Sequence, residues 1–372
     1  MPKRHHPSWI EIDCKRFQEN TRIIRKYIGK TKYCLPVKAH GYGHGLTEIA
    51  AEAEKTSIDY LGVACLQEGI ILRQAGCRLP IIVFGPIFEK QIKDFIYYDL
   101  EFSLSSILKA KWAQRQCKKI QKKCHVHIEV DTGIQRTGMK PKTALKAIEM
   151  ILNDPAFCLK GIYSHFATSS HPNDVFALHQ IDLFKTMKTQ APLKNTHLIW
   201  HMSNSGGCAF YKNAHFDMVR PALLSFGYGE SPLPPPLNAL KPCLSLKSKI
   251  SYFKVVEKGT GISYNHTYVT KKRSRIVTIP LGYGDGYPRA LSNKGYVLIR
   301  GKRFPIAGLV CMDQFMVDIG DAEAFVGDEV VLIGSQGEET ITASDLATLA
   351  QTDIRDILCS FSLRLPRKYL SV

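Results

Sequence analysis

Short apolar segments of strand composition alternate with longer, helix-patterned segments over the first two thirds of the chain, and this alternation restricts the fold most. Eight segments have strand character, at residues 34–39, 60–65, 80–85, 101–105, 125–130, 159–164, 197–201 and 218–226. Helical patterns lie between them, as at residues 46–54, 67–74, 141–152 and 175–188; the seventh helix, near residues 206–212, is short. Eight such units predict an α/β fold that begins with a (β/α)8, or TIM, barrel.

The chain changes character after a proline-rich segment at residues 230–242, which is expected to be a linker because proline continues neither a helix nor a central strand. Short β-branched runs follow, separated by Gly, Asn and Asp turns, at residues 247–256, 275–280, 296–300, 304–309, 315–319 and 329–333, with one helix near residues 344–351. We therefore predict two domains, the barrel at residues 1–235 and a mostly antiparallel β domain at residues 236–372.

Composition excludes several classes of protein. With 45% hydrophobic and 22% charged residues, the chain is globular rather than disordered or fibrous. The basic N-terminus has no apolar signal core, and no apolar run approaches bilayer length, so we expect a cytoplasmic protein without a membrane span. The 11 cysteines are odd in number and form no C-x-x-C pair, which favours reduced thiols over disulfides or a zinc cage.

The net charge of +17 raises the question of a nucleic-acid partner. The basic excess is spread over both predicted domains. The one dense basic run, at residues 109–123, has the spacing of an amphipathic helix whose charged face is exposed to solvent. A solvated helix face is therefore favoured, with an RNA or membrane-surface patch as the minor alternative. We predict no nucleic-acid partner.

Polar residues follow the predicted barrel strands, where the loops of such a barrel carry its reactive groups. Lys38 ends the first strand, Arg136 follows the fifth, His165 ends the sixth and Arg220 lies in the eighth. The seventh is followed by a small-residue loop, Ser203-Asn204-Ser205-Gly206-Gly207. One mouth of the barrel would therefore collect a lysine, two arginines, a histidine and this loop.

Lys38 stands at the end of an apolar strand, where a lysine that extends its amine to solvent is the commoner case. Neighbouring cations and partial desolvation nevertheless lower the pKa of a lysine, and a neutral amine can form a Schiff base with an aldehyde. Ser205 with its two following glycines, and the backbone at Ala222 and Leu223, offer unhindered N–H groups where barrels bind phosphate. A Schiff-base lysine beside a phosphate pocket implies pyridoxal 5'-phosphate.

Other patterns in the barrel point to no ligand. Gly41, Gly43 and Gly45 match neither G-x-G-x-x-G nor a P-loop, so they support no nucleotide site. The pairs His40/His44 and His125/His127 lack the further ligands of a metal cage, and we predict no metal.

Two clusters in the second domain go beyond what a β fold needs, at residues 263–268 and 282–289. Residues 311–314 precede a strand and could be simple turn chemistry. Gly-Tyr-rich turns are often only hairpins, and that alternative is strong for residues 282–289. A tyrosine beside a cation can ionise below its reference pKa of about 10, however, and then serve as a base.

These residues together resemble the bacterial alanine racemases. The segment from Val37 to Gly45 is similar to the pyridoxal-phosphate signature of that family. The likeness continues, in order and through both domains, in Val130-Asp131-Thr132-Gly133-Ile134-Gln135-Arg136-Thr137-Gly138, Ser164-His165-Phe166-Ala167-Thr168, Asn204-Ser205, Met218-Val219-Arg220-Pro221, Ser263-Tyr264, residues 282–289 and Cys311-Met312-Asp313.

The resemblance implies a fold-type-III enzyme that forms a head-to-tail homodimer with shared active sites, each combining Lys38 of one subunit with Tyr264 and Met312 of the other. Lys38 and Tyr264 would be the two catalytic bases, on opposite faces of a planar cofactor adduct. The cofactor would be bound by Lys38, Tyr42, His165, Asn204, Ser205, Arg220, Ala222 and Leu223. Arg136 and the Met312 backbone would orient the substrate carboxylate, and Glu129 and Asp313 would support them.

Elementary chemistry explains several of the residue roles that the resemblance implies. Racemisation removes a proton from one face of the α-carbon and returns one to the other, so two bases that alternate between acid and base suffice. Arg220 would face the pyridine nitrogen, and because arginine keeps its own protons it leaves the ring neutral and a weaker electron sink, which limits side reactions. His165 would link Arg220 to Tyr264.

The chain departs from the family's pattern at two positions. Many members have a carbamylated lysine two residues before the aspartate of the D-T-G motif, where this chain has Glu129. We expect Glu129 to supply that negative charge to Arg136, directly or through a small anion or water; otherwise it merely pairs with a lysine. Some relatives place a phosphate-contacting tyrosine where this chain has Leu363, which leaves cofactor affinity and substrate breadth open.

The function that the resemblance implies is interconversion of L- and D-alanine, which supplies D-alanine for peptidoglycan. A broader racemase acting on serine or another amino acid is the alternative. An amino-acid decarboxylase fits the paired bases less well. A non-catalytic pyridoxal-phosphate carrier would not need the long second domain.

Overall fold

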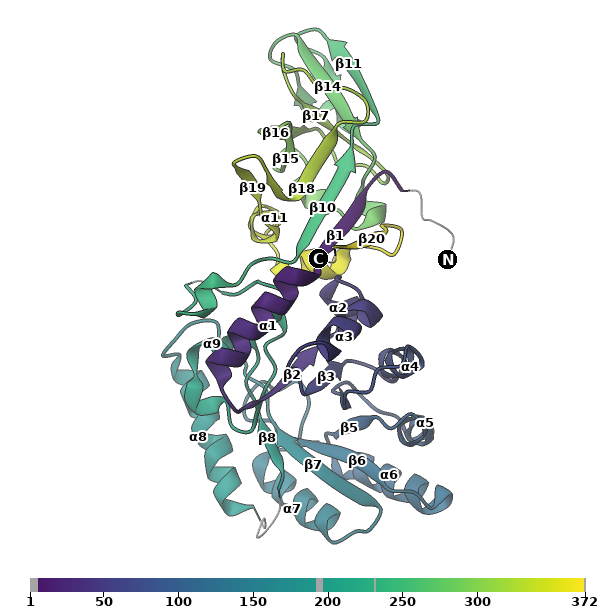
Figure 1. The fold of residues 1–372 in the computed structure, drawn as a ribbon, viewed down its shortest axis with the longest axis vertical. Coiled ribbons are helices and arrows are strands. Elements are labelled where there is room, and N and C mark those ends of the chain that lie inside the picture. The colour runs from purple at the N-terminus through teal and green to yellow at the C-terminus, as the bar shows by residue number, and fades with distance from the viewer. Residues whose placement is uncertain (1–5, 192–196, 231, 371–372) are drawn as a thin grey trace. The chain divides into compact units, whose positions relative to one another are not determined.

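The computed structural model describes residues 6–191, 197–230 and 232–370, which form two compact units (Figure 1). The barrel unit comprises residues 16–41 and 46–242. The strand unit comprises the chain up to Lys15, residues 42–45, and the chain from Cys243 onward. The predicted boundary assigned the whole N-terminus to the barrel, whereas the contacts place residues 6–15 with the strand unit. The predicted linker, as far as it is described, lies in the barrel unit and holds the 3-10 turn Leu237–Ala239.

The barrel unit contains eight parallel strands, which confirms the predicted barrel. They are β2 (Lys32–Pro36), β3 (Tyr60–Val63), β4 (Ile81–Val83), β5 (Glu101–Leu104), β6 (Cys124–Glu129), β7 (Phe157–Tyr163), β8 (Ile199–His201) and β9 (Met218–Val219). Their order is β8-β7-β6-β5-β4-β3-β2-β9. The ends of this order are joined by hydrogen bonds from Asp217 N to Trp200 O (2.9 Å) and from Arg220 N to Ser203 O (2.8 Å), which nearly close the ring.

Several predicted strands are shorter than expected, and the first and the eighth matter most for the site. The eighth was predicted to reach residue 226, but Pro221 follows β9 closely and the turn α10 (Ala222–Ser225) begins after it. The first strand ends at Pro36, and the residues from Lys38 onward turn away from the sheet. In both places the chain leaves the sheet at a predicted functional residue.

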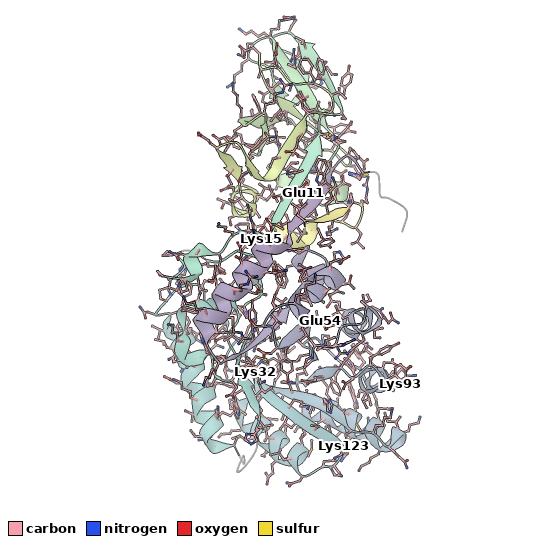
Figure 2. The ribbon with its side chains drawn as sticks, in the orientation of Figure 1. Glu11, Lys15, Lys32, Glu54, Lys93 and Lys123 are labelled. Carbon is pink, nitrogen blue, oxygen red and sulfur yellow. The ribbon has the colours of Figure 1, made fainter. Side chains whose placement is uncertain are left out.

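Helices surround the barrel strands (Figure 1). They are α1 (Cys14–Ile28), α3 (Leu46–Glu54), α4 (Leu66–Gln74), α5 (Ile92–Tyr97), α6 (Ile107–Ile120), α7 (Pro141–Leu152), α8 (Val175–Gln190) and α9 (Ser205–Phe210). α6 carries most of the predicted basic run and buries Ala110, Ala113 and Cys117, while most of its lysines face outward. Figure 2 labels three exposed lysines of this unit, Lys32, Lys93 and Lys123, of which only Lys123 belongs to the run. The run therefore lies on the exposed side of a helix whose other side is buried, as its spacing predicted.

The interior of the barrel has an apolar and a polar part. Cys34, Ile82 and Met218 form a buried apolar cluster from three different strands, as inward-pointing residues of such barrels do. Elsewhere the interior is polar, because Glu101, His127 and His201 lie on β5, β6 and β8 and are buried. β7 separates β6 from β8, so the contact between the two histidines is made across the interior.

The strand unit is mostly antiparallel, as predicted. Its strands are β1 (Trp9–Asp13), β10 (Leu244–Lys249), β11 (Tyr252–Val256), β12 (Gly261–Ile262), β13 (Tyr268–Val269), β14 (Ser274–Ile279), β15 (Tyr296–Ile299), β16 (Lys302–Ala307), β17 (Phe315–Asp318), β18 (Glu329–Gln336), β19 (Glu339–Ile341) and β20 (Arg367–Leu370). The main order is β11-β14-β17-β16-β15-β18-β10-β1-β20, and two helices follow β19, α11 (Ala343–Ala350) and α12 (Ile354–Ser360). The single strand predicted at residues 247–256 is two strands, β10 and β11.

β1 accounts for the difference at the N-terminus. It pairs antiparallel with β10 and parallel with β20, and its Ile10 and Ile12 are completely buried. The N-terminal segment thus enters the sheet of the strand unit before the chain continues into α1. None of the described helices is long and apolar enough to cross a membrane.

Candidate functional site

Lys38 begins a left-handed turn at the end of β2. Ala39, His40 and Gly41 have φ of 51°, 56° and 64°, and Gly41 N donates to Val37 O at 2.8 Å. Left-handed backbone costs a residue with a Cβ about 1–2 kcal/mol, so two such residues in succession are strained. Strain of this kind is typical of functional sites, where the surrounding structure holds it in place. The exposed Lys38 side chain is thereby carried on a rigid turn.

Glu68 in the first turn of α4 holds this strained turn. Its Oε1 accepts from Ala39 N at 2.7 Å and its Oε2 accepts from Ala64 N at 2.8 Å. One carboxylate therefore ties the residue after Lys38 to the end of the next barrel strand. Glu68 was not predicted as a site residue, because its only local signal is an acidic side chain in the first turn of a helix.

Arg136 and Glu129 lie at the loop that follows β6. The Glu129 carboxylate is buried and accepts from the Thr137 hydroxyl at 2.7 Å, while Arg136 is exposed. Burial raises the pKa of Glu129, although Thr137, the nearby Arg136 charge and Tyr163 counteract that effect. Asp131 shapes the loop, since its Oδ1 accepts from Gly133 N at 2.9 Å and from Gln135 N at 3.2 Å.

Arg220 follows β9 and is almost completely buried. Its Nη2 donates to Ser164 O at 2.8 Å and Met202 O at 3.1 Å, and it lies 3.2 Å from His165 Nδ1. Its guanidinium carbon is 5.5 Å from each of two ring centroids, those of Phe84 and Tyr163. Burial lowers the pKa of Arg220. The structure therefore brings the predicted pair Arg220 and His165 together on a fixed guanidinium.

The predicted phosphate residues also meet. Ser205 begins α9 and its hydroxyl accepts from Leu223 N at 3.0 Å, in the turn that Ala222 begins. Asn204 caps α9, because its Oδ1 accepts from Gly207 N at 2.9 Å. The Ser205 oxygen takes the position where an anionic oxygen could accept the same N–H, so this part of the barrel fits a phosphate group.

Tyr264 and Met312 belong to the strand unit, where Ser263 connects their segments. The Ser263 hydroxyl donates to Leu309 O at 2.8 Å and lies 3.7 Å from Cys311 Sγ. Tyr264 is 70% exposed and Met312 is 55% exposed. The two predicted residues thus lie on neighbouring loops, and both side chains are exposed.

The Gly-Tyr-rich segment at residues 282–289 supports Met312 rather than forming a simple hairpin. Gly284 N donates to Met312 O at 2.8 Å, and a Cβ on Gly282 would lie only 2.2 Å from that oxygen. Arg364 joins the segments, with contacts to the buried Asp285 (3.3 Å) and to Asp313 (3.0 Å). The cluster predicted at residues 282–289 contains Asp285, and Asp313 was predicted too, but their connection through Arg364 was not, because the three residues lie far apart in the chain.

Tyr42 is buried in a segment whose contacts belong to the strand unit. Its neighbour Gly43 has φ of +81°, and a Cβ there would lie 2.0 Å from Leu358 O. Arg367 Nε donates to Gly43 O at 2.8 Å. The glycine is thus required by close packing against α12. Leu363, the second departure, is 57% exposed.

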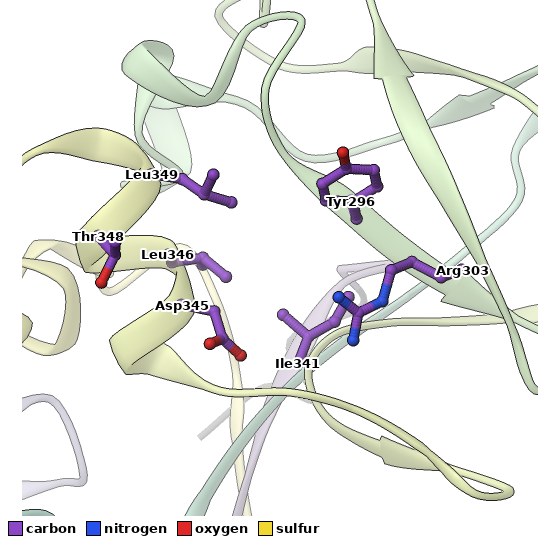
Figure 3. A pocket seen from close by; sticks show the side chains of 7 residues that line it. All are labelled: Tyr296, Arg303, Ile341, Asp345, Leu346, Thr348 and Leu349. Atoms are coloured by element: carbon purple, nitrogen blue, oxygen red, sulfur yellow. The ribbon is translucent and has the colours of Figure 1, made fainter.

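Metal-binding groups and pockets are the two remaining features that could indicate a site. The described residues contain no group of three or more His, Cys, Asp or Glu that could hold a metal ion. A pocket of about 270 Å³ lies in the strand unit, lined by residues of α11 with Tyr296, Arg303 and Ile341 (Figure 3). Its described lining includes none of the predicted site residues.

Comparison with known proteins covers both units. A family model described as the alanine racemase N-terminal domain matches residues 12–230, and one described as the alanine racemase C-terminal domain matches residues 243–369. An alanine racemase of Halothermothrix orenii is 38% identical, with 98% of this chain and 97% of that protein covered. One of Carboxydothermus hydrogenoformans is 37% identical, with 98% and 100% covered.

Solved structures give the same result. An alanine racemase from a Streptomyces lavendulae that produces D-cycloserine has a TM-score of 0.93 at 29% identity, with 100% of this chain and 98% of that chain covered. An alanine racemase of Clostridium difficile 630 has a TM-score of 0.92 at 34% identity, with 98% and 96% covered. One of Bacillus anthracis, with bound L-Ala-P, has a TM-score of 0.90 at 31% identity, with 99% and 96% covered.

Proposed function

The chain belongs to the alanine racemase family, whose members are isomerases, and we propose that it interconverts L-alanine and D-alanine with pyridoxal 5'-phosphate as cofactor. The observation that carries the proposal is the match of both family models, in order, over nearly the whole chain. Relatives named alanine racemase, at 35–38% identity, do not favour the broader-specificity alternative. The substrate is a small molecule.

The barrel unit offers all the groups that would bind the cofactor except Tyr42, which belongs to the strand unit. When bound, pyridoxal phosphate withdraws electrons from a substrate amino acid and so makes its α-proton acidic. Lys38 Nζ would bind the cofactor covalently, with Tyr42, Ser205 and the backbone of Ala222 and Leu223 at the phosphate. Asn204 would hold Ser205 in place. The contact between the Ser205 hydroxyl and Leu223 N supports this assignment, because it joins two of the proposed phosphate ligands.

Arg220 would face the ring nitrogen of the cofactor. Its guanidinium is fixed by two backbone carbonyls and by its contact with His165. Arginine retains its protons, so Arg220 would donate a hydrogen bond to the ring nitrogen without transferring a proton. His165 would connect Arg220 to Tyr264, and the Arg220 half of that connection is the contact described above.

Lys38 and Tyr264 would move the protons. One removes the α-proton from its face while the other, on the opposite face, delivers a proton from its own Nζ or phenolic oxygen. The roles reverse for the other enantiomer. The rigid turn that carries Lys38 supports this assignment, because a base must keep its position relative to the α-carbon.

The substrate carboxylate would be bound by Arg136 and the Met312 backbone, with Asp313 in support. We propose a homodimer in which Tyr264 and Met312 complete the site of the partner subunit. Their exposure, 70% and 55%, supports that arrangement, since a base in contact with solvent needs a covering surface to work. We further propose that the enzyme is cytoplasmic and supplies D-alanine for peptidoglycan.

A chiral product assay tests the proposed function. Purified protein with added pyridoxal 5'-phosphate should convert L-alanine and D-alanine to the same final mixture, because racemisation of a free amino acid has an equilibrium constant of one. Other small amino acids such as serine should react more slowly. Equal or faster turnover of another amino acid, or none of alanine, would contradict the proposal.

Glu129→Gln tests the first departure from the family's pattern. If Glu129 supplies the negative charge beside Arg136, the KM for alanine should rise by about tenfold, the equivalent of one charged hydrogen bond. Glu149→Gln, on the exposed face of α7, is the control. Unchanged KM and turnover in Glu129→Gln would show that Glu129 has no such role.

The same variant should gain stability at neutral pH. Because burial raises the pKa of Glu129, the folded state binds its proton more tightly than the unfolded state does. The contribution of Glu129 to the free energy of unfolding is therefore present at low pH and is lost as the pH rises through the pKa of Glu129 in the folded state. The variant's Tm should exceed that of the wild type at pH 7, and the difference should shrink in acid.

A further inference from the structure

A chain of hydrogen bonds crosses the barrel interior from Glu101 to Arg220. Glu101 Oε2 lies 2.7 Å from His127 Nε2, His127 Nδ1 lies 3.1 Å from His201 Nε2, and His201 Nδ1 lies 2.6 Å from Arg220 Nη1. Both histidines are completely buried, and Glu101 and Arg220 are only 6% and 5% exposed. Buried polar groups of this kind remain only where each has a partner.

The two ends determine the direction of every bond in this chain. The Arg220 guanidinium can only donate, so His201 Nδ1 must accept. A neutral imidazole carries one proton, which for His201 must then be on Nε2 and be donated to His127 Nδ1. By the same rule, the proton of His127 is on Nε2 and is donated to the Glu101 carboxylate. Both rings are therefore the Nε2–H tautomer.

No other arrangement of protons satisfies all three contacts. If Glu101 donated a proton instead, His127 would carry its proton on Nδ1, where it would face the N–H of His201. If His201 were charged, its Nδ1–H would face a second donor, the Arg220 guanidinium. Burial, the Arg220 charge and His127 hold the pKa of His201 well below its usual value, in agreement with a neutral ring.

We propose that Glu101 is a positioning residue for Arg220, which it orients through His127 and His201. The inference rests on the proposed function in one respect only, namely that Arg220 faces the cofactor. Glu101 fixes the tautomers so that His201 presents a lone pair to Nη1, and two carbonyls hold Nη2. Without an acceptor at Glu101, both rings can carry Nδ1–H, and His201 then repels the guanidinium.

The test combines two substitutions in the full-length protein with histidine-ring ¹⁵N spectra, which distinguish protonated from unprotonated ring nitrogens. Methionine is similar in length to glutamate but offers no strong acceptor. In Glu101→Met the ring proton should therefore move from Nε2 to Nδ1 in at least one of the two histidines. Glu101→Gln keeps an acceptor and loses the charge, so the tautomers should persist. The proton resonance of His127 Nε2–H should then move upfield. Glu149→Gln is the matched control and should leave every ring signal unchanged.

Cofactor binding provides the second measurement. In Glu101→Met the dissociation constant for pyridoxal 5'-phosphate should rise about tenfold. kcat should fall while the KM for alanine stays near the wild-type value, because the proposed substrate ligands are elsewhere. A merely structural role would lower Tm without moving the ring signals.

The outcomes separate the two proposals. Ring signals that match the wild type in both Glu101 variants would overturn the inference, as would a tautomer change that leaves cofactor affinity untouched. If Glu101→Met does not fold, Glu101→Gln alone tests the inference: the upfield shift of the His127 Nε2–H resonance would support it, and an unchanged resonance would overturn it. A wild-type protein with both Nε2–H tautomers but no affinity for the cofactor would instead refute the proposed function and leave the hydrogen-bond chain standing.

Discussion

Lys38→Ala should give a protein that stays colourless after incubation with pyridoxal 5'-phosphate and produces no measurable D-alanine from L-alanine. Its Nζ is proposed both to bind the cofactor covalently and to exchange a proton on one face, so one substitution removes both contributions. Loss of a general base alone lowers turnover about 10²–10⁴-fold, and loss of the covalent attachment adds to that. Visible absorbance and chiral chromatography measure the two effects.

Lys32→Ala is the matched control for this prediction. Lys32 is exposed at the start of β2, the strand that precedes Lys38, and should be replaceable with no loss of colour or activity. Borohydride reduction followed by peptide mapping should place the cofactor on Lys38 in the wild type. A reduced cofactor found on another lysine, or colour retained in Lys38→Ala, would show that the attachment site is assigned wrongly.

The barrel could be predicted from the sequence because its signals are local. Each buried parallel strand is a short apolar run, and the predicted helices at 46–54 and 141–152 agree with α3 and α7 to the residue. β1 could not be predicted in this way, because its partners β10 and β20 lie more than two hundred residues away. Its alternating residues bury Ile10 and Ile12 only once that pairing exists.

The site could be predicted in part. Positions at strand ends made Lys38, Arg136, His165 and Arg220 the candidates, because the chemistry of such barrels is found at those ends, and their roles stay predictions. Glu101 and His127 were not predicted to connect with Arg220, since they lie inside strands and become partners only across the closed barrel. The positive φ of Ala39 was also not predictable, because alanine does not signal a left-handed turn.

Tyr264→Phe should reduce racemisation about 10²–10⁴-fold in both directions while leaving the cofactor bound, because the phenolic oxygen is proposed to act on protons and not on the cofactor. With one base left, Lys38 can still exchange the α-proton of one enantiomer. The variant should therefore incorporate solvent deuterium into one enantiomer of alanine much faster than into the other. Mass spectrometry of recovered L-alanine and D-alanine measures this asymmetry.

Tyr252→Phe, at an exposed tyrosine of β11 in the same unit, is the control and should match the wild type in rate and in exchange. Asymmetric exchange requires two bases on opposite faces, since a single base that served both faces would lose both exchanges together. Equal loss of exchange from the two enantiomers in Tyr264→Phe would therefore exclude the two-base assignment. Colour retained alongside a one-sided exchange would place Tyr264 on the face opposite Lys38.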